Sequence, residues 1–237
     1  MEQVKQQIVV KDLGLIDYQA AWDYQEQLLK ENVQLKSRVA GQLSKPTTNY
    51  LLFCEHPPVY TLGKSGHLEN LLISREELEE QGIGFVPTNR GGDITFHGPG
   101  QIVGYPIIDL ENFFTDIGKY LRFLEEVIIR TLAEYGVAGD RSKGETGVWI
   151  APHDPQQARK ICAMGVRCSR WVTMHGFALN VNTMMAYFNN IVACGIADKK
   201  VASLDQELGR KVDIEEVKAH LARHFGEVFE AEMSDVV

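Results

Sequence analysis

Apolar residues that recur at the spacing of a helix face predict the main helices of this chain. The strongest pattern covers 116–135, and Gly136 follows it at the position where helices commonly end. Its apolar stripe consists of Ile117, Leu121, Leu124, Ile128, Leu132 and Tyr135. The other predicted helices span 17–41, 203–208 and 213–229, and a short acidic one follows the capping-box pair Ser74 and Glu77.

Short apolar runs between turn residues predict strands in the middle of the chain. Because helices flank these strands on both sides along the sequence, we expect one α/β (α+β) domain over 1–237, with a mixed sheet flanked by helices. The predicted strands span 50–54, 59–62, 102–108, 147–150, 160–166, 171–174 and 177–181.

Residues 90–101 interrupt the strand pattern with four glycines and a proline. Glycine and proline both oppose a helix, and glycine lets the main chain approach a ligand closely. The run also carries the polar side chains of Arg90, Asp93, Thr95 and His97. It predicts a binding loop anchored by the following apolar strand, and the alternative is a glycine-rich hairpin connection that binds nothing.

Composition narrows the classes of function. The chain has 237 residues, 44% of them hydrophobic, and a formal net charge of −8. This acidic balance opposes binding to nucleic acid, and no apolar run is long enough for a membrane span. The first residues lack the pattern of a signal peptide, and four cysteines at irregular positions do not suggest a disulfide framework. We therefore expect a cytoplasmic protein that binds neither nucleic acid nor membrane.

The cysteines are candidate nucleophiles. Cys54 ends an apolar strand and suits a buried core position, while Cys168 lies near two arginines that would lower the pKa of its thiol. Cys162 stands two residues from Lys160, so both side chains of a regular strand would share one face. Cys194 precedes a glycine after an apolar segment, as an exposed nucleophile could. Spacing alone leaves Cys162 and Cys194 both open.

Lys160 is unusual because it lies in an apolar strand. Desolvation there would favour a neutral amine that acts as a general base, whereas a lysine on an edge strand would point to solvent. Cys162, Cys168 and His175 lack metal-site spacing, and neither a P-loop nor a dinucleotide motif is present. We expect no metal and no cofactor.

The run Arg-Gly-Gly-Asp-Ile-Thr-Phe-His-Gly-Pro-Gly-Gln at 90–101 resembles the signature of the octanoyltransferases of lipoate biosynthesis, the LipB family. Three more segments resemble this family in the same order, so the resemblance covers most of the chain. They are Glu-His-Pro-Pro-Val-Tyr-Thr-Leu-Gly at 55–63, Lys-Ile-Cys-Ala-Met-Gly-Val-Arg at 160–167 with His-Gly-Phe-Ala-Leu-Asn-Val-Asn at 175–182, and Ala-Cys-Gly at 193–195.

The resemblance implies a fold similar to the catalytic domains of biotin and lipoate protein ligases. It also implies an acyltransferase that begins endogenous protein lipoylation. Such an enzyme moves an octanoyl or lipoyl group from acyl carrier protein to a lysine of a lipoyl domain, through a thioester on a cysteine. The implied acceptors are E2 subunits of 2-oxoacid dehydrogenases and the glycine cleavage H protein.

The family's functional residues carry over onto matching positions. Its acyl-accepting cysteine falls on Cys194, and the lysine that lowers the cysteine pKa, or acts as general base, falls on Lys160. Phe96 stands where tyrosine is common, and Ala193 where proline is common. The implied substrate pocket consists of Arg90, Gly91, Gly92, Asp93, Ile94, Thr95, Phe96, His97, Ala163, Met164, Gly165, Gly176, Phe177 and Ala178.

Two other functions compete with this one. An ATP-dependent lipoate or biotin ligase on the same fold would activate a free acid and need no cysteine. A non-catalytic binder of acylated carrier protein would form no covalent adduct. For the transferase, backbone N–H groups near Gly165 or in the 90–101 run are the expected donors to the oxyanion of each intermediate.

Overall fold

A nine-stranded mixed sheet forms the centre of the protein, in a computed structural model that describes residues 5–37, 46–192 and 200–235. Its strands run in the order β12-β1-β2-β6-β10-β9-β8-β7, and β11 pairs with β9. The strands are β1 (Gln7–Leu15), β2 (Asn49–Glu55), β6 (Gln101–Ile107), β7 (Gly139–Asp140), β8 (Val148–Ile150), β9 (Arg159–Ser169), β10 (Val172–Asn180), β11 (Lys200–Val201) and β12 (Glu232–Asp235). The β1–β2, β1–β12 and β9–β11 pairs are parallel and the others antiparallel, which confirms the predicted mixed sheet.

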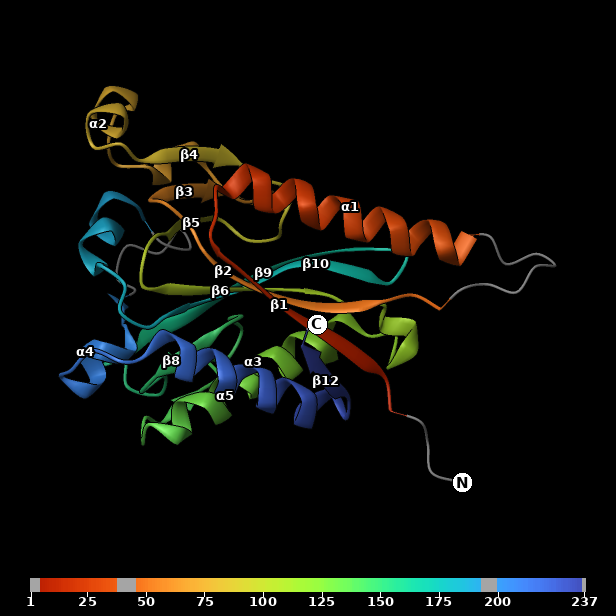
Figure 1. The fold of residues 1–237 in the computed structure, drawn as a ribbon. Coiled ribbons are helices and arrows are strands. Elements are labelled where there is room, and N and C mark those ends of the chain that lie inside the picture. Colours follow the sequence, from red (N-terminus) through yellow and green to blue (C-terminus); the bar gives the residue numbers. More distant parts are fainter. Residues whose placement is uncertain (1–4, 38–45, 193–199, 236–237) are drawn as a thin grey trace.

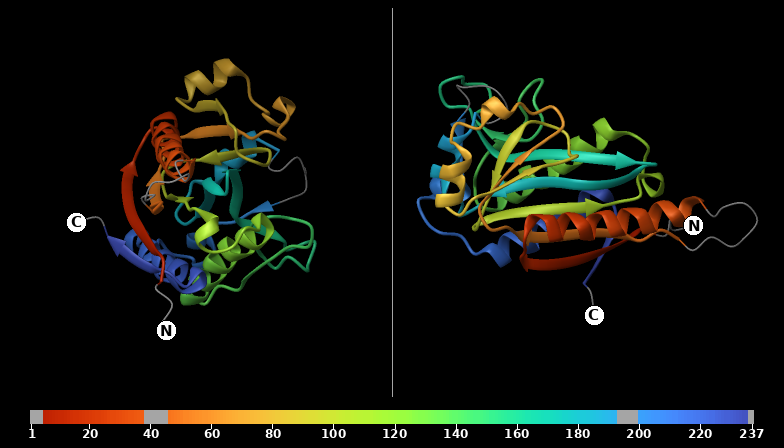
Figure 2. Two further views of the ribbon diagram at one scale, coloured as in Figure 1. Left: turned by 90° about the vertical axis from the view of Figure 1, so that its right-hand side faces the viewer. Right: turned by 90° about the horizontal axis from the view of Figure 1, so that it is seen from above.

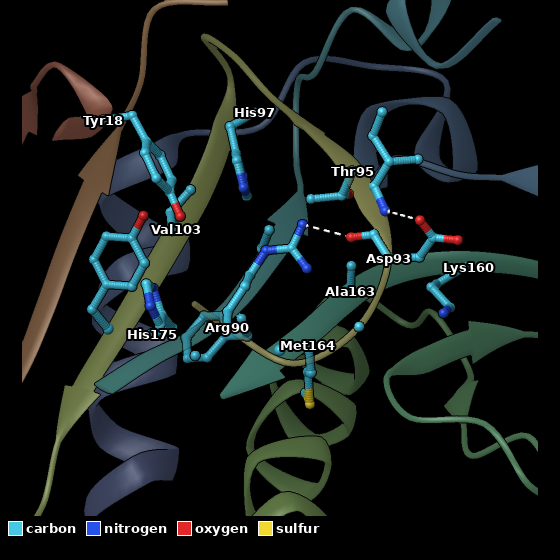
Figure 3. A pocket seen from close by; sticks show the side chains of 17 residues that line it. Tyr18, Arg90, Asp93, Thr95, His97, Val103, Lys160, Ala163, Met164 and His175 are labelled. Carbon is cyan, nitrogen blue, oxygen red and sulfur yellow. Dashed lines mark hydrogen bonds between the residues drawn. The ribbon is translucent and has the colours of Figure 1, made fainter. Parts of the chain in front are cut away.

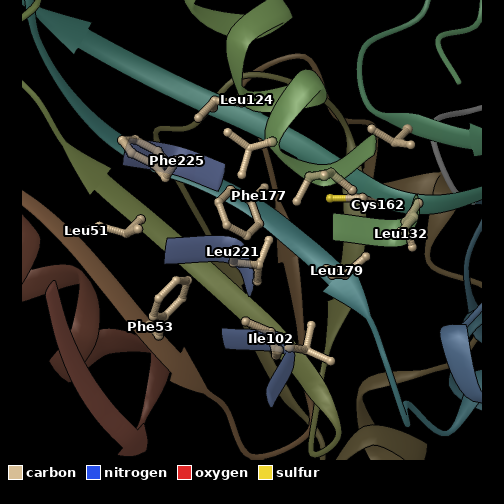
Figure 4. Close-up of a cluster of buried hydrophobic side chains, with 14 of the residues drawn as sticks. Leu51, Phe53, Ile102, Leu124, Leu132, Cys162, Phe177, Leu179, Leu221 and Phe225 are labelled. Carbon is tan, nitrogen blue, oxygen red and sulfur yellow. The ribbon is translucent and has the colours of Figure 1, made fainter. Parts of the chain in front are cut away.

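Helices cover both faces of this sheet (Figures 1 and 2). The helices α3 (Ile117–Glu134) and α5 (Ile214–Phe229) pack on one face, and α1 (Tyr18–Ser37) packs on the other. Leu124 and Leu132 of α3 and Leu221 of α5 join sheet residues in the larger core (Figure 4). The short helix α4 (Leu204–Leu208) precedes α5. These helices confirm the predicted ones, although 38–41 of the first lie outside the described residues.

A second, three-stranded sheet lies beside α1 and carries the glycine-rich run (Figure 1). Its order is β4-β3-β5, with β3 (Val59–Leu62) between β4 (Gly84–Pro87) and β5 (Ile94–His97). The 90–101 run therefore contains a strand and then crosses to β6 of the main sheet, so it is not a hairpin. The helix α2 (Arg75–Glu80) lies between β3 and β4 in the sequence and has the predicted capping box. Three 3-10 turns complete the described elements: η1 (Leu68–Asn70), η2 (Leu110–Asn112) and η3 (Met185–Asn190).

The strand β10 corrects one prediction. Residues 171–174 and 177–181 were expected to form two strands, because His175 and Gly176 separate their apolar runs. Instead a single strand continues through both residues, and His175 keeps its pairing with Val166 while adopting a left-handed φ of 55°. Arg170 and Trp171 also have positive φ and form the tight turn from β9.

Candidate active site

One pocket gathers most of the predicted site residues. Its walls come from α1, the 90–93 loop, β5, β6, β9 and β10, so segments distant in sequence meet around it (Figure 3). The predicted residues that line it are Arg90, Gly92, Asp93, Ile94, Thr95, His97, Lys160, Ala163, Met164, Gly165, Gly176, Phe177 and Ala178.

Arg90 holds the glycine-rich loop in place. Its Nη2 donates hydrogen bonds to the Thr61 carbonyl (2.7 Å), the Thr61 hydroxyl (2.9 Å) and the Asp93 carbonyl (2.8 Å). Its Nη1 donates to the carbonyl of Gly91 at 2.9 Å. A guanidinium offers five donors in a fixed plane, so this one side chain fastens the loop to β3.

The hydrogen bonds around His97 have a single consistent direction. Gln101 donates through Nε2 to Asn180 Oδ1 (2.9 Å), so its oxygen accepts from His97 Nδ1 (2.8 Å). His97 Nε2 then accepts from Thr61, 3.2 Å away, whose oxygen accepts from Arg90. Burial, with His56 and Arg90 nearby, lowers the pKa of His97 well below its ordinary value. His97 is therefore neutral and supports the pocket wall.

A bulge in β9 turns Lys160 into the pocket. Val148 and Trp149 are consecutive on β8, yet they pair with Cys162 and Lys160, so Ile161 is an extra residue. Ile161 and Cys162 both face the core under α3, whereas Lys160 lines the pocket with Ala163. The prediction that Lys160 and Cys162 share a face is thus wrong. Lys160 is 8% exposed, so the alternative of a lysine pointing to solvent is also wrong.

The described cysteines lie away from the pocket lining. Cys54 and Cys162 are fully buried, as predicted for Cys54, and burial raises the pKa of both thiols. Burial also raises the pKa of the Cys168 thiol. The prediction that the neighbouring arginines lower this pKa is therefore wrong. Cys194 lies outside the described residues.

The chain on either side of 193–199 is tied to the walls of this pocket. On one side, the Val192 N–H donates to the Asn70 carbonyl (2.8 Å), and Asn70 Nδ2 donates to Asp93 (2.6 Å). On the other side, Val201 pairs with Lys160, and the Ala202 N–H donates to the Lys160 carbonyl (2.9 Å). Asp93 and Lys160, both lining residues, therefore hold the two described ends of this connection.

Four lining residues had not been assigned to the pocket from the sequence: Tyr18, Val103, Tyr105 and His175. Tyr18 was predicted only as part of a helix stripe, and Tyr105 only as part of a buried strand. His175 immediately precedes Gly-Phe-Ala, the segment at 176–178 that the sequence did assign to the pocket. This neighbouring position is the signal that could have identified it. Burial raises the pKa of Tyr18 to about 12, so its phenol keeps its proton.

Gly91 and Phe96 do not line the pocket. The Gly91 N–H donates to the Val166 carbonyl (3.1 Å), and Phe96 stacks on Tyr187 in a separate core beneath the small sheet.

The backbone of Gly165 is not available as an oxyanion donor. Val166 and His175 are paired across β9 and β10, but they exchange no hydrogen bonds, because the Val166 carbonyl accepts from Gly91 and the His175 N–H donates to Gln25. By antiparallel alternation the Gly165 N–H then faces β10, which removes it from the expected oxyanion donors.

Comparisons with known proteins agree on a family. The Lipoyl protein ligase A/B catalytic domain family matches residues 17–226. The octanoyltransferase of Flavobacterium johnsoniae is 61% identical over 232 residues, which are 97% of this chain and 100% of that protein.

Solved structures agree on the fold. The bipartite lipoate protein ligase of Thermoplasma acidophilum matches with a TM-score of 0.68 and 16% identity, covering 99% of this chain and 88% of that one. The biotin protein ligase of Aquifex aeolicus matches with a TM-score of 0.51 and 13% identity, covering 96% and 71%. These two likenesses bear on the fold alone and confirm the predicted ligase-like architecture. By sequence, the chain belongs to the lipoyl protein ligase A/B catalytic domain family and, within it, to the octanoyltransferases.

Proposed function

We propose that this octanoyltransferase takes an octanoyl group from the thioester of acyl carrier protein and delivers it to a lysine of a lipoyl-carrying protein. Cys194 is the acyl-accepting nucleophile, and Lys160 is the base that assists it. The pocket described above holds the acyl chain, in one catalytic domain that spans the whole chain.

The observation that carries this proposal is that two lining residues, Asp93 and Lys160, hold the two described ends of the connection that bears Cys194. Val192 is tied through Asn70 to Asp93, and Val201 pairs with Lys160 itself. Cys194 follows Val192 by two residues, which span at most about 7 Å of chain. Cys194 is therefore joined by two residues of chain to a residue that Asn70 ties to the pocket wall.

The other cysteines are poorly suited to the same role. Cys162 faces the core on the opposite side of β9 from the pocket, and burial raises its thiol pKa. A nucleophilic cysteine needs access and an accessible thiolate. The choice between Cys162 and Cys194, which spacing left open, therefore favours Cys194.

The first chemical step exchanges one thioester for another. Lys160 accepts the proton of the Cys194 thiol, and the thiolate attacks the carbonyl carbon of the octanoyl thioester. A new carbon–sulfur bond forms to Cys194, and the bond to the carrier sulfur breaks. The carrier thiolate leaves with the proton held by Lys160. The two thioesters are similar in free energy, so the equilibrium constant of this step is close to one.

The second step makes an amide and runs downhill. The amine of the incoming lysine attacks the Cys194 thioester, loses a proton to Lys160, and displaces the cysteine, which takes the proton back. Lipoyl-carrying proteins are the general class of acceptor for this family. The acceptors we propose are the lipoyl domains of E2 subunits and the glycine cleavage H protein.

Intact mass spectrometry tests the proposal directly. Incubation with octanoyl-carrier protein, without ATP, should add one octanoyl group to the wild-type chain. Cys194→Ala should abolish this adduct, and Lys160→Gln should slow its formation by at least about 100-fold. Cys162→Ala is the matched control and should retain the adduct.

Three outcomes would overturn the proposal. An adduct that survives in Cys194→Ala but vanishes in Cys162→Ala would identify another nucleophile. A requirement for ATP and a free acid would identify a ligase. Tight binding of octanoyl-carrier protein with neither an adduct nor an acylated lipoyl domain would identify a binding protein.

A further inference from the structure

One residue of the pocket lining, His175, carries a buried hydrogen-bond acceptor that none of the described residues satisfies. His175 is 1% exposed and lines the pocket, and its Nδ1 has no hydrogen-bond partner among the residues of 5–37, 46–192 and 200–235. Buried polar atoms are nearly always paired in folded proteins. This atom therefore points to a partner that the pocket receives from outside the protein.

The neighbours of His175 determine the chemistry of this atom. His175 Nε2 lies 2.7 Å from Asn89 Oδ1, and Asn89 Nδ2 donates to the Glu26 carboxylate at 3.3 Å. Because the carboxylate only accepts, the amide oxygen of Asn89 must face the imidazole, and His175 Nε2 carries the proton. Burial, with Arg90 and Arg167 nearby, lowers the pKa of His175 to about 3. Nδ1 is therefore an unprotonated acceptor at neutral pH.

The backbone aims this side chain at the pocket. In a regular strand His175 would face the same side as Phe177 and Leu179, which belong to the core under α3 and α5. Its left-handed φ of 55° instead brings the ring against Trp22 of α1 and Tyr105 of β6, with ring centroids 5.9 Å and 6.4 Å away. A left-handed backbone is strained for a histidine. The strain places a polar ring at the pocket end.

His175 and Lys160 lie at opposite ends of the pocket (Figure 3). His175 pairs with Val166, and the Ala178–Ala163 pair lies three residues along the same strands, toward Lys160. Three residues of strand span roughly 10 Å. An extended octanoyl chain measures about 9 Å from its carbonyl to its last carbon. A chain whose carbonyl is beside Lys160 therefore ends near His175.

We infer that His175 Nδ1 accepts a hydrogen bond from the far end of the acyl chain, so that the pocket takes medium-length acyl thioesters with a terminal hydroxyl group. This inference rests on the proposed function, because it needs the acyl carbonyl at Lys160. The Tyr105 hydroxyl is already committed, because it donates to His56 Nε2 at 2.8 Å while His56 Nδ1 donates to the Ile16 carbonyl. Trp22 Nε1 and Gln25 Nε2, on residues that contact His175, also lack a partner among the described residues, but both are donors. A terminal carboxylate has no hydrogen to donate at neutral pH and is not accepted.

The test compares carrier-protein thioesters of octanoate, 8-hydroxyoctanoate and 8-fluorooctanoate, because fluorine matches the hydroxyl in size but donates no hydrogen. In the wild type, kcat/KM for the hydroxy substrate should lie within about 10-fold of that for octanoate and exceed that for the fluoro substrate. In His175→Phe the hydroxy-to-fluoro ratio should fall by about 10- to 100-fold, because the hydroxyl is then buried without a partner. Val103→Ala, which changes the pocket wall without removing an acceptor, should leave this ratio unchanged.

The wild-type measurement keeps the inference falsifiable even if His175→Phe does not fold. Rejection of the hydroxy substrate by more than about 100-fold, with normal octanoyl transfer, overturns the inference and leaves the proposed function intact. The same holds if the hydroxy-to-fluoro ratio is equal in wild type and a folded His175→Phe. Absence of octanoyl transfer in the wild type would instead overturn the proposed function.

Discussion

The side-chain nitrogen of Lys160 lies 4.7 Å from the centre of the Trp149 ring, and the two residues pair across β8 and β9. An aromatic face attracts, with about 0.5–2 kcal/mol when the pair is desolvated, the ammonium form that Lys160 takes in the proposed mechanism after it accepts the thiol proton. Trp149 therefore positions the lysine that we propose as the base. Nothing in the sequence pattern had linked these two residues.

Replacing Trp149 should separate the attraction of its aromatic face for Lys160 from the apolar area that the side chain buries. Trp149→Phe keeps an aromatic face under Lys160, and we expect kcat for octanoyl transfer to fall by less than about 5-fold. Trp149→Leu removes that face, and we expect a fall of at least about 10-fold. Both changes lose buried area, so thermal unfolding of both variants is the control. Equal rates in two folded variants would show that the ring does not position the lysine.

Gly165 permits the close approach of the glycine-rich loop. A Cβ atom there would lie 2.6 Å from the Gly91 carbonyl oxygen and 3.3 Å from Arg90 Cδ. Gly165→Ala should therefore displace the loop and reduce transfer by at least about 10-fold. Gly118→Ala is the matched control, because Gly118 lies in the exposed first turn of α3, where alanine favours the helix. Unchanged kinetics in Gly165→Ala would mean that the loop does not form the pocket wall.

Arg90→Lys tests the loop attachment. Lysine keeps the positive charge but cannot reach the carbonyls of Thr61, Gly91 and Asp93 together. We expect KM for octanoyl-carrier protein to rise by at least about 10-fold, and limited proteolysis to cut the 90–93 loop faster. If charge alone mattered, the lysine variant would behave as the wild type and Arg90→Met would not.

Stability should depend on pH through His56, His97 and His175. Burial lowers the pKa of all three in the folded protein. In the unfolded chain each takes up a proton as pH falls through about 6.5, whereas the folded protein takes it up only at lower pH. Each histidine should therefore lower the free energy of unfolding as pH falls below that point, by at most about 1.4 kcal/mol per pH unit, and His175 should do so until about pH 3.

Urea unfolding between pH 5.5 and 4.5 measures this effect. His175→Gln should reduce the slope of unfolding free energy against pH by the equivalent of about one proton. Val103→Ala is the control, because it also changes the pocket wall but removes no titratable group, and it should leave the slope unchanged. An unchanged slope in His175→Gln would mean that His175 is protonated in the folded protein.

Local patterns predicted much of the fold. The apolar stripe of 116–135 and the pair Ser74 and Glu77 gave helices at the expected places, since both signals act within a few turns of chain. The terminal strands β1 and β12 were not predicted. They depend on pairing between residues at opposite ends of the sequence, such as Ile8 with Met233.

The candidate site depended on two local departures from regular structure. The bulge at Ile161 moved Lys160 to the pocket side, and the left-handed φ of His175 turned its ring there. Regular alternation along a strand assumes that neither departure occurs. It therefore put Lys160 on the same face as Cys162, and it gave no reason to assign His175 to the pocket. The motif resemblance located Lys160 because it does not rely on the direction of side chains.

The chain of hydrogen bonds from Arg90 through Thr61, His97 and Gln101 to Asn180 has a final consequence. Asn180 donates onward to the Ala202 carbonyl, so the hydrogen bonds of Thr61, His97, Gln101 and Asn180 all run in one direction. A proton cannot hop along such a row without reversing all of its members. This side of the pocket is therefore poorly suited to carrying protons, and in the proposed mechanism the protons of acyl transfer pass through Lys160 instead.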